Sequence, residues 1–167
     1  RPLYSSFSMN RILYLLPLAL TLTVTSCGPQ YLYENDQTFA EGQWTYQDSL
    51  VNDFTIADTF ALYNLHLFLE HGVDFPSQNT YVRLHTTFPD GQRMTREVSL
   101  ELANKAGAWY GDCSRDRCSL DIPIQQGAFF NQASEYRITI EQFSRQNPLP
   151  EIYRIGFALE ATGEQRR

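Results

Sequence analysis

Residues 63–70 read YNLHLFLE, and this stretch decides the fold. Its apolar side chains stand at every second position, as Tyr63, Leu65, Leu67 and Leu69. Strict alternation places one set of side chains in a core and the other set in water, as in an antiparallel sheet. The stretch therefore predicts a half-buried β-strand rather than a helix.

The same period of two recurs along the chain, and turn sequences such as Pro89-Asp90-Gly91 separate the runs. No stretch keeps a helical period, and residues 124–134 are expected to be a short connector. Evenly spaced strands of this kind predict an all-β chain with a single antiparallel β-sandwich, Ig-like or jelly-roll-like, over residues 44–162. We expect about seven strands, at residues 53–57, 60–70, 80–88, 93–102, 118–124, 135–143 and 152–160.

Composition excludes two broad classes of protein. The chain has 167 residues, with 13 Lys and Arg against 19 Asp and Glu, for a formal net charge of −6. A nucleic-acid binder that tracks phosphates needs a basic face, so this class is excluded. Beyond residue 27 no apolar run approaches the roughly 18 residues of a membrane-spanning helix, which excludes a polytopic membrane protein.

The N-terminal part, residues 1–26, is predicted to be a lipoprotein signal peptide with a few upstream residues. From Met9 the chain reads MNRILYLLPLALTLTVTSC, with one cation followed by an apolar stretch. Its last four residues, Val24 to Cys27, fit a bacterial lipobox, so we expect Cys27 to carry diacylglycerol and palmitate. The alternative is an ordinary signal peptide or membrane anchor with an incidental cysteine.

Residues 27–43 are predicted to be a lipidated, flexible tether, because Gly, Pro, Gln, Asn and acidic residues dominate them. Fully extended, such a tether would reach at most about 55 Å from the membrane. Several acyl chains on one cysteine give stable attachment without a membrane span. Residues 163–167 are expected to form a C-terminal tail.

The two remaining cysteines, Cys113 and Cys118, are separated by Ser-Arg-Asp-Arg. Outside the cytoplasm this spacing favours a disulfide that closes a tight loop, with free thiols or a metal site as alternatives. A metal would need two further ligands, and the three histidines show no ligand spacing to these cysteines. A six-residue ring would contribute only about 2 kcal/mol.

The chain carries no common local signature of a hydrolase, metalloprotease or nucleotide site. We therefore expect no catalytic residue, no metal and no cofactor. His71 and Asp74 could be combined into a catalytic pair, but a solvated turn that leads into Phe75 is favoured. His66 and His85 fall on the outward phase of their strands and are expected at the surface.

Trp109 and Tyr110 form the most interesting aromatic stretch, between Gly107 and Gly111. An exposed aromatic pair on a rigid loop could contact a sugar or a protein partner. The other interpretation is that Trp109 closes one end of the sandwich core.

The lipobox is followed by Trp44–Ser49, by Tyr63–Leu65 and by a series of further short stretches as far as Ile155–Phe157. In this order they resemble the gliding-motility lipoprotein GldH family over most of residues 31–160. The resemblance implies a Bacteroidetes-type outer-membrane lipoprotein, needed for gliding by machinery that is coupled to protein secretion. It implies no catalytic residues, and the cysteine pair is not part of its pattern. The stretches that carry it are the lipobox, Trp44–Ser49, Tyr63–Leu65, Asp74–Asn79, Phe88–Gly91, Gly107–Gly111, Ile140–Gln142 and Ile155–Phe157.

The expected function is that of a non-catalytic docking module, held to the membrane through Cys27 and bound to other envelope proteins. The alternatives are a glycan- or peptidoglycan-binding module and an enzyme without a local signature. Surface lipoproteins of Bacteroidetes resemble one another in acidic residues directly after the cysteine. Here Gly28 follows the cysteine and the first acid is Glu34. We therefore expect the domain to face the periplasm.

Overall fold

The structure is a computed structural model that describes residues 28–167, so the signal peptide and Cys27 lie outside the described residues. The described part contains strands and turns but no α-helix. The strands are β1 (Tyr31–Thr38), β2 (Gln43–Trp44), β3 (Leu50–Thr55), β4 (Ala61–Gly72), β5 (Asn79–Thr87), β6 (Arg93–Glu101), β7 (Asp112–Ser114), β8 (Arg117–Ala128), β9 (Glu135–Gln142), β10 (Leu149–Pro150) and β11 (Ile152–Gln165).

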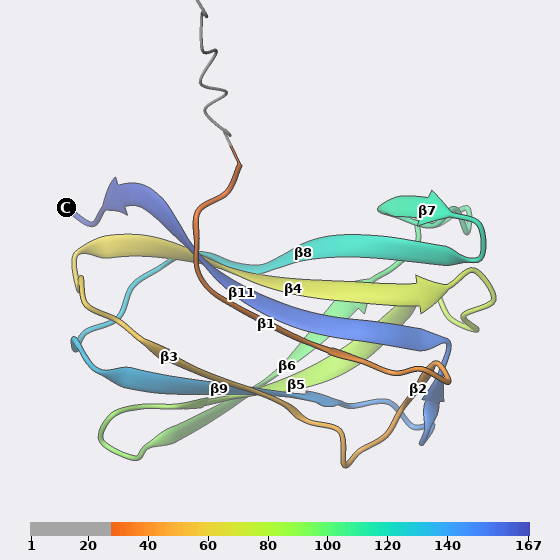
Figure 1. Cartoon of the computed structure of the whole chain (residues 1–167), viewed down its shortest axis with the longest axis horizontal. Coiled ribbons are helices and arrows are strands. Elements are labelled where there is room, and N and C mark those ends of the chain that lie inside the picture. Colours follow the sequence, from red (N-terminus) through yellow and green to blue (C-terminus); the bar gives the residue numbers. More distant parts are fainter. Residues whose placement is uncertain (1–27) are drawn as a thin grey trace, which may run out of the picture.

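Two antiparallel sheets face each other, which confirms the predicted all-β sandwich (Figure 1). The larger sheet has the strand order β1-β11-β4-β8-β7, and the smaller has the order β3-β9-β5-β6. Strands β2 and β10 form a separate short pair at one end. The stretch that decided the fold lies in β4, at the centre of the larger sheet.

All seven predicted strands are present, as β3 to β6, β8, β9 and β11. Strand β8 continues to Ala128, into the expected connector, and β11 continues to Gln165. The structure adds four strands, β1, β2, β7 and β10, so the estimate of about seven was too low. The four additional strands are edge strands or very short strands. Such strands show little or no alternation of buried and exposed side chains, which is the pattern that the prediction used.

The predicted tether is wrong for residues 31–38, because these residues form β1. They pair with β11 from Tyr31 opposite Glu160 to Thr38 opposite Arg154. The sandwich therefore runs from residue 31 to residue 165 rather than from 44 to 162, and most of the expected tail belongs to β11. As an edge strand, β1 exposes every second side chain, so its composition resembles that of a linker.

Two asparagines hold β1 against the smaller sheet. Asn52 of β3 is fully buried, and its side-chain amide donates to the carbonyl of Ile138 at 3.1 Å. Its Oδ1 accepts a hydrogen bond from Asn35 of β1 at 3.2 Å, and Asn35 also donates to the carbonyl of Val51. These bonds satisfy a buried amide and join the two sheets at their shared edge.

The space between the sheets is filled by the inward phase of each strand. Leu65, Leu67 and Leu69 of β4 are almost completely buried, as their alternation predicted. Around Phe54 lies an aromatic cluster that includes Tyr136 and Phe157, with ring centroids about 6 Å apart. This single continuous core gives the loops at both ends a fixed base.

The two ends of the sandwich are named here by their distance from the start of β1 (Figure 1). The near end holds the C-terminus and the turns 56–60, 88–92 and 129–134. The far end holds the short pair of β2 with β10 and the loops 73–78, 102–111 and 143–148.

Candidate docking site

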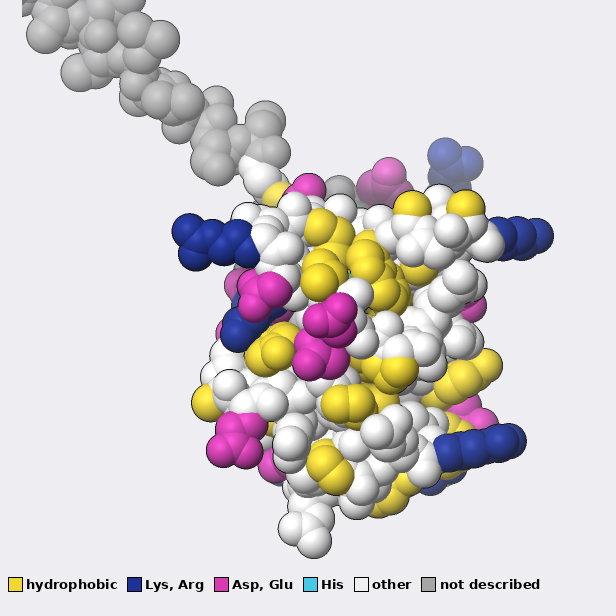
Figure 2. Space-filling view, turned by 90° about the vertical axis from the view of Figure 1, so that its right-hand side faces the viewer, with side chains coloured by type: hydrophobic (Ala, Val, Ile, Leu, Met, Phe, Trp, Pro, Cys, Tyr) yellow, Lys and Arg dark blue, Asp and Glu magenta, His cyan; other side chains and the backbone are white. Residues whose placement is uncertain are grey.

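A groove of about 650 Å³ lies at the far end, between the β4–β5 turn and the loop that follows β9. Figure 2 looks onto this end and shows hydrophobic side chains gathered there, with acidic side chains beside them. Five aromatic or apolar residues line the groove together with polar residues that include one cation, Arg145, and one carboxylate, Glu97. The five are Phe75, Pro76, Tyr81, Phe143 and Leu149.

Two aromatic side chains of the groove are unusually exposed. Tyr81 lies on the outward phase of β5 and is 46% exposed, and Phe143 is 38% exposed. The backbone N–H of Phe143 donates to the carbonyl of Tyr81, which holds the two residues side by side. Exposed aromatic side chains with fixed positions are typical of the centres of protein interfaces.

An arginine side chain, that of Arg83, also packs against one face of the Phe143 ring. The guanidinium carbon of Arg83 lies 3.8 Å from the ring centroid, and the same group pairs with Glu97 at 3.0 Å. This cation–π contact restricts the ring without covering both of its faces.

The loop 143–148 is ordered by side chains from two segments. The hydroxyl of Tyr46 donates to the carbonyl of Ser144 at 2.7 Å, and the N–H of Tyr46 donates to Asn147 Oδ1. From β9, Gln142 Oε1 accepts the N–H of Ser144 at 2.9 Å. A loop fixed in this way loses little conformational entropy when a partner binds.

The predicted aromatic pair is divided between the core and the surface. Trp109 is partly buried, and its ring lies edge-on to that of His71 at 4.6 Å. Tyr110 is exposed, and its N–H donates to the carbonyl of Leu102. Trp109 thus closes this end of the core, the second of the two interpretations, and the two rings do not form an exposed platform.

His71 is fully buried, so the solvated turn expected around it is wrong at this residue. Its Nδ1 donates to the carbonyl of Gly72 at 2.8 Å, while Nε2 has no partner. Burial lowers the pKa of His71 and keeps the ring neutral. Asp74 is exposed, and the structure brings no catalytic pair together here.

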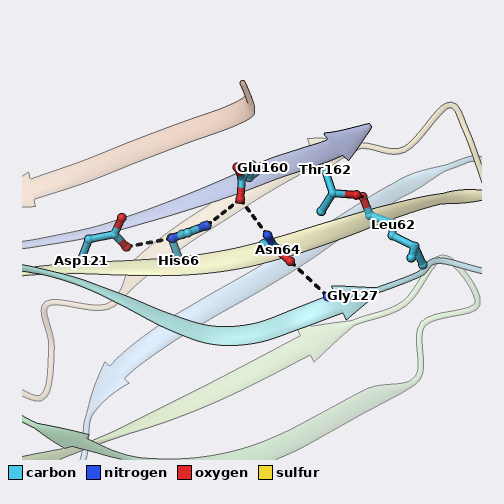
Figure 3. A network of polar contacts seen from close by, with 7 residues as sticks. All are labelled: Leu62, Asn64, His66, Asp121, Gly127, Glu160 and Thr162. Carbon is cyan, nitrogen blue, oxygen red and sulfur yellow. Dashed lines mark hydrogen bonds and ion pairs between the residues drawn. The ribbon is translucent and has the colours of Figure 1, made fainter. Parts of the chain in front are cut away.

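His66 lies outside the core, as its phase predicted, but it is not a free surface residue. Its side chain is 13% exposed, with Nδ1 2.8 Å from Asp121 and Nε2 3.0 Å from Glu160 (Figure 3). Burial lowers the pKa of His66, but the hydrogen bonds to the two carboxylates outweigh burial and raise it overall.

The network continues from Glu160 to the side-chain amide of Asn64, which donates to it at 2.8 Å. This bond, together with His66, holds the pKa of Glu160 below its usual value. Because both ring nitrogens of His66 have carboxylate partners, His66 offers no free base. The arrangement therefore joins β8, β4 and β11 on their outer face.

His85 follows the same pattern on the smaller sheet. It is 9% exposed, with Nδ1 2.8 Å from the hydroxyl of Thr95 and Nε2 3.0 Å from Glu141. Both histidines are on the outer phase of their strands, as predicted, but neither is a free surface residue, because side chains on the two neighbouring strands cover each ring. For His66 both strands, β8 and β11, are far away in the sequence. For His85 only β9 is distant, because β6 follows β5 directly in the same hairpin.

Cys113 and Cys118 are joined by a disulfide and face each other across the β7–β8 hairpin. Within residues 28–167, no group of three or more His, Cys, Asp or Glu side chains is arranged to hold a metal ion. In the same part of the chain, no helix is long and apolar enough to cross a membrane. The expected lipid site, Cys27, precedes the described residues.

The groove residues were not singled out from the sequence. For Tyr81 the sequence did contain a signal. An aromatic residue on the outward phase of a strand points away from the core, which indicates an exposed ring that could contact a partner. No local signal existed for the groove itself, because it forms only where the loops 73–78 and 143–148 meet.

Two solved structures are similar in part. The first is a family 35 carbohydrate-binding module from Clostridium thermocellum, with a TM-score of 0.32 and 9% identity, covering 74% of this chain and 97% of that chain. The second is the coat protein of Tobacco streak virus, with a TM-score of 0.24 and 8% identity, covering 81% of this chain and 88% of that chain. Both TM-scores are below 0.5, so neither likeness bears on function.

Comparison with curated proteins gave no match. The family described as GldH lipoprotein matches residues 31–159, which begin with β1 and reach into β11, and therefore cover almost the whole sandwich. This match spans most of the chain and agrees with the resemblance seen in the sequence. The chain belongs to the GldH lipoprotein family.

Proposed function

We propose that this lipoprotein is a non-catalytic docking module that binds another envelope protein through the groove at its far end. The groove carries the proposal, because it presents Tyr81 on strand β5 and Phe143 on the ordered loop that follows β9. In this role the protein is anchored by lipid on Cys27 in the outer membrane, faces the periplasm and serves machinery linked to gliding and protein secretion.

The chemistry of the groove suits an apolar side chain of a partner protein. Its volume of about 650 Å³ lies within the range of sites that enclose a small ligand or an anchoring side chain. Arg145 lines the groove, so an acidic residue beside the anchoring side chain would find a cation there, whereas Arg83 is already paired with Glu97.

The state of the histidines supports a non-catalytic role. The ring nitrogens of His66 and His85 are hydrogen-bonded to neighbouring side chains, and His71 is enclosed beside Trp109. None of the three has a free ring nitrogen in an open site, where a general base must reach its substrate.

Site-specific photo-crosslinking in cells tests the docking role. A photoreactive phenylalanine analogue at Tyr81 is expected to crosslink to one envelope protein. The same analogue at Met94, which is similarly exposed at the near end, is the matched control and is expected not to do so. Equal crosslinking from both positions, or none from Tyr81, would contradict the proposal.

Titration of the purified protein with muropeptides tests the glycan alternative. If muropeptides bind and Tyr81→Ala abolishes binding, the groove is a glycan site and the docking role is wrong. The direction faced is tested separately with external protease on intact cells. Digestion of the domain while a periplasmic control protein survives would show a surface-exposed protein.

A further inference from the structure

The start of β1 lies very close in sequence to the predicted lipid site. Tyr31 follows Cys27 by four residues, and a chain of that length spans at most about 14 Å in any conformation. If Cys27 carries lipid, as the proposed function states, the start of β1 must lie next to the bilayer. The sandwich is then held at the membrane surface.

The chain enters the sandwich beside the end of its last strand. The carbonyl of Gln30 accepts a hydrogen bond from the N–H of Ala161, in the second half of β11. From there β11 runs only as far as Gln165, which pairs with Ala61, and the N–H of Arg166 donates to the carbonyl of Phe60. The start of β1 and the near end are therefore neighbours (Figure 1).

The near end carries an exposed apolar patch of Phe60, Phe129 and Arg166. The two rings are 59% and 52% exposed, and the guanidinium carbon of Arg166 lies 5.1 Å from both ring centroids. Phe129 also lines a cavity of about 340 Å³ together with Met94, so the apolar surface continues between the sheets. Exposed Phe rings beside a cationic side chain are typical of surfaces that lie at the boundary between lipid headgroups and acyl chains.

The outer face of the larger sheet is a poor alternative for membrane contact, although Tyr31 also lies on it. That face is strongly polar: it carries five carboxylates, and its arginines Arg117 and Arg154 are already paired with two of them, so they are not free to bind lipid phosphates. The five carboxylates are Glu34, Asp36, Glu70, Asp121 and Glu160. At the near end, Asp58 accepts hydrogen bonds from the N–H groups of Phe60 and Ala61. Asp90 accepts the N–H of Gln92, and Glu164 lies beside the cations Arg166 and Arg167.

We propose that the near-end patch of Phe60, Phe129 and Arg166 rests in the headgroup layer of the bilayer that anchors Cys27. There the two rings leave water and contact the upper part of the acyl chains. The guanidinium of Arg166 donates hydrogen bonds to lipid phosphate oxygens. The lipid and the patch together orient the sandwich, so the far end points away from the membrane.

Tryptophan quenching in proteoliposomes tests this orientation. The lipidated full-length protein is reconstituted into phosphatidylethanolamine–phosphatidylglycerol vesicles that contain lipids brominated near the headgroup. Phe60→Trp is expected to be quenched several-fold more than the native Trp44 and Trp109, which lie at the far end. Tyr81→Trp is the matched control, with an exposed aromatic side chain at the far end, and is expected to stay unquenched.

The outcomes separate the inference from the proposed function. Protein that does not float with the vesicles overturns the lipid anchor, and the inference with it, because the inference rests on that anchor. Protein that floats but shows no quenching of Phe60→Trp, or equal quenching of Tyr81→Trp, overturns the inference alone. Phe129→Trp provides a second reporter if Phe60→Trp does not fold, and Arg166→Glu is expected to reduce the quenching of either reporter.

Discussion

Replacement of His66 by glutamine removes the cation from between Asp121 and Glu160. The charged imidazole donates one hydrogen bond to each carboxylate, at 2.8 and 3.0 Å. The bond to Glu160 is well covered and is expected to contribute about 1.5 kcal/mol, as hydrogen bonds to charged groups do. Asp121 is half exposed, so its bond adds only about 0.5 kcal/mol. We therefore expect a loss of about 2 kcal/mol at mildly acidic pH.

The loss depends on pH in a defined direction. The pKa of His66 is raised above 6.5 in the folded protein, so its contribution is complete below pH 6.5 and disappears as the pH rises through the folded-state value. The pKa of Glu160 is lowered from 4.5, so its contribution is present above pH 4.5 and is lost as the pH falls through the lowered value. The network therefore stabilises the fold most between pH 4.5 and 6.5.

Urea unfolding of wild type and His66→Gln, at about pH 5.5 and about pH 8.5, measures this dependence. Above its folded-state pKa the ring has one N–H and can donate to only one carboxylate, so the difference between the two proteins is expected to shrink. Arg137→Gln is the control, because it breaks the exposed pair with Asp53 and neither group titrates in this range. Equal differences for His66→Gln at both pH values would refute the reasoning.

Three further variants have defined outcomes. Gly111→Ala is expected to lower the stability of the fold more than Gly91→Ala does. Both glycines have a positive φ, so an alanine at either position costs about 1 kcal/mol. Only at Gly111 would the new Cβ also collide with the backbone oxygen of Ser119. Equal melting temperatures for the two variants would contradict this. Cys113→Ser is expected to keep the fold but to lower the free energy of unfolding by about 2 kcal/mol, measured by urea unfolding with circular dichroism. An unfolded variant would show that the disulfide is needed for folding of the whole domain. Cys27→Ser is expected to move the protein from the membrane to the soluble envelope fraction, and unchanged sedimentation with membranes would count against the lipid anchor.

Strands whose faces differ in burial could be predicted from the sequence, and edge strands could not. β4 is paired on both sides. Its residues Leu65, Leu67 and Leu69 point inward, while Asn64 and His66 point outward, so the alternation is plain. In β1 the inward phase includes Asn35, because that side chain is needed to satisfy Asn52, and the outward phase includes acids. What makes β1 a strand is its pairing with β11, more than a hundred residues later, which no local pattern contains.

The candidate site was accessible from sequence only in part. That Trp109 packs against the core with part of its surface buried could be anticipated, since large aromatic side chains are usually largely buried. The groove at Tyr81 and Phe143 depends on loops brought together by the whole sandwich. The partners of His66 likewise come from β8 and β11, so their effect on its pKa is a property of the sheet and not of any sequence motif.

The direction of β1 has a mechanical consequence if the protein is attached to a membrane at its near end and bound to a partner at its far end. A pull between the anchor before Tyr31 and a partner at the far end would act along the strands, because β1 runs from the near end towards the far end. Such a pull would shear the β1–β11 ladder, so its hydrogen bonds would share the force and yield together. A pull across the strands would instead unzip them one at a time. If the proposed anchor and docking role hold, this geometry lets the domain bear tension along its strands.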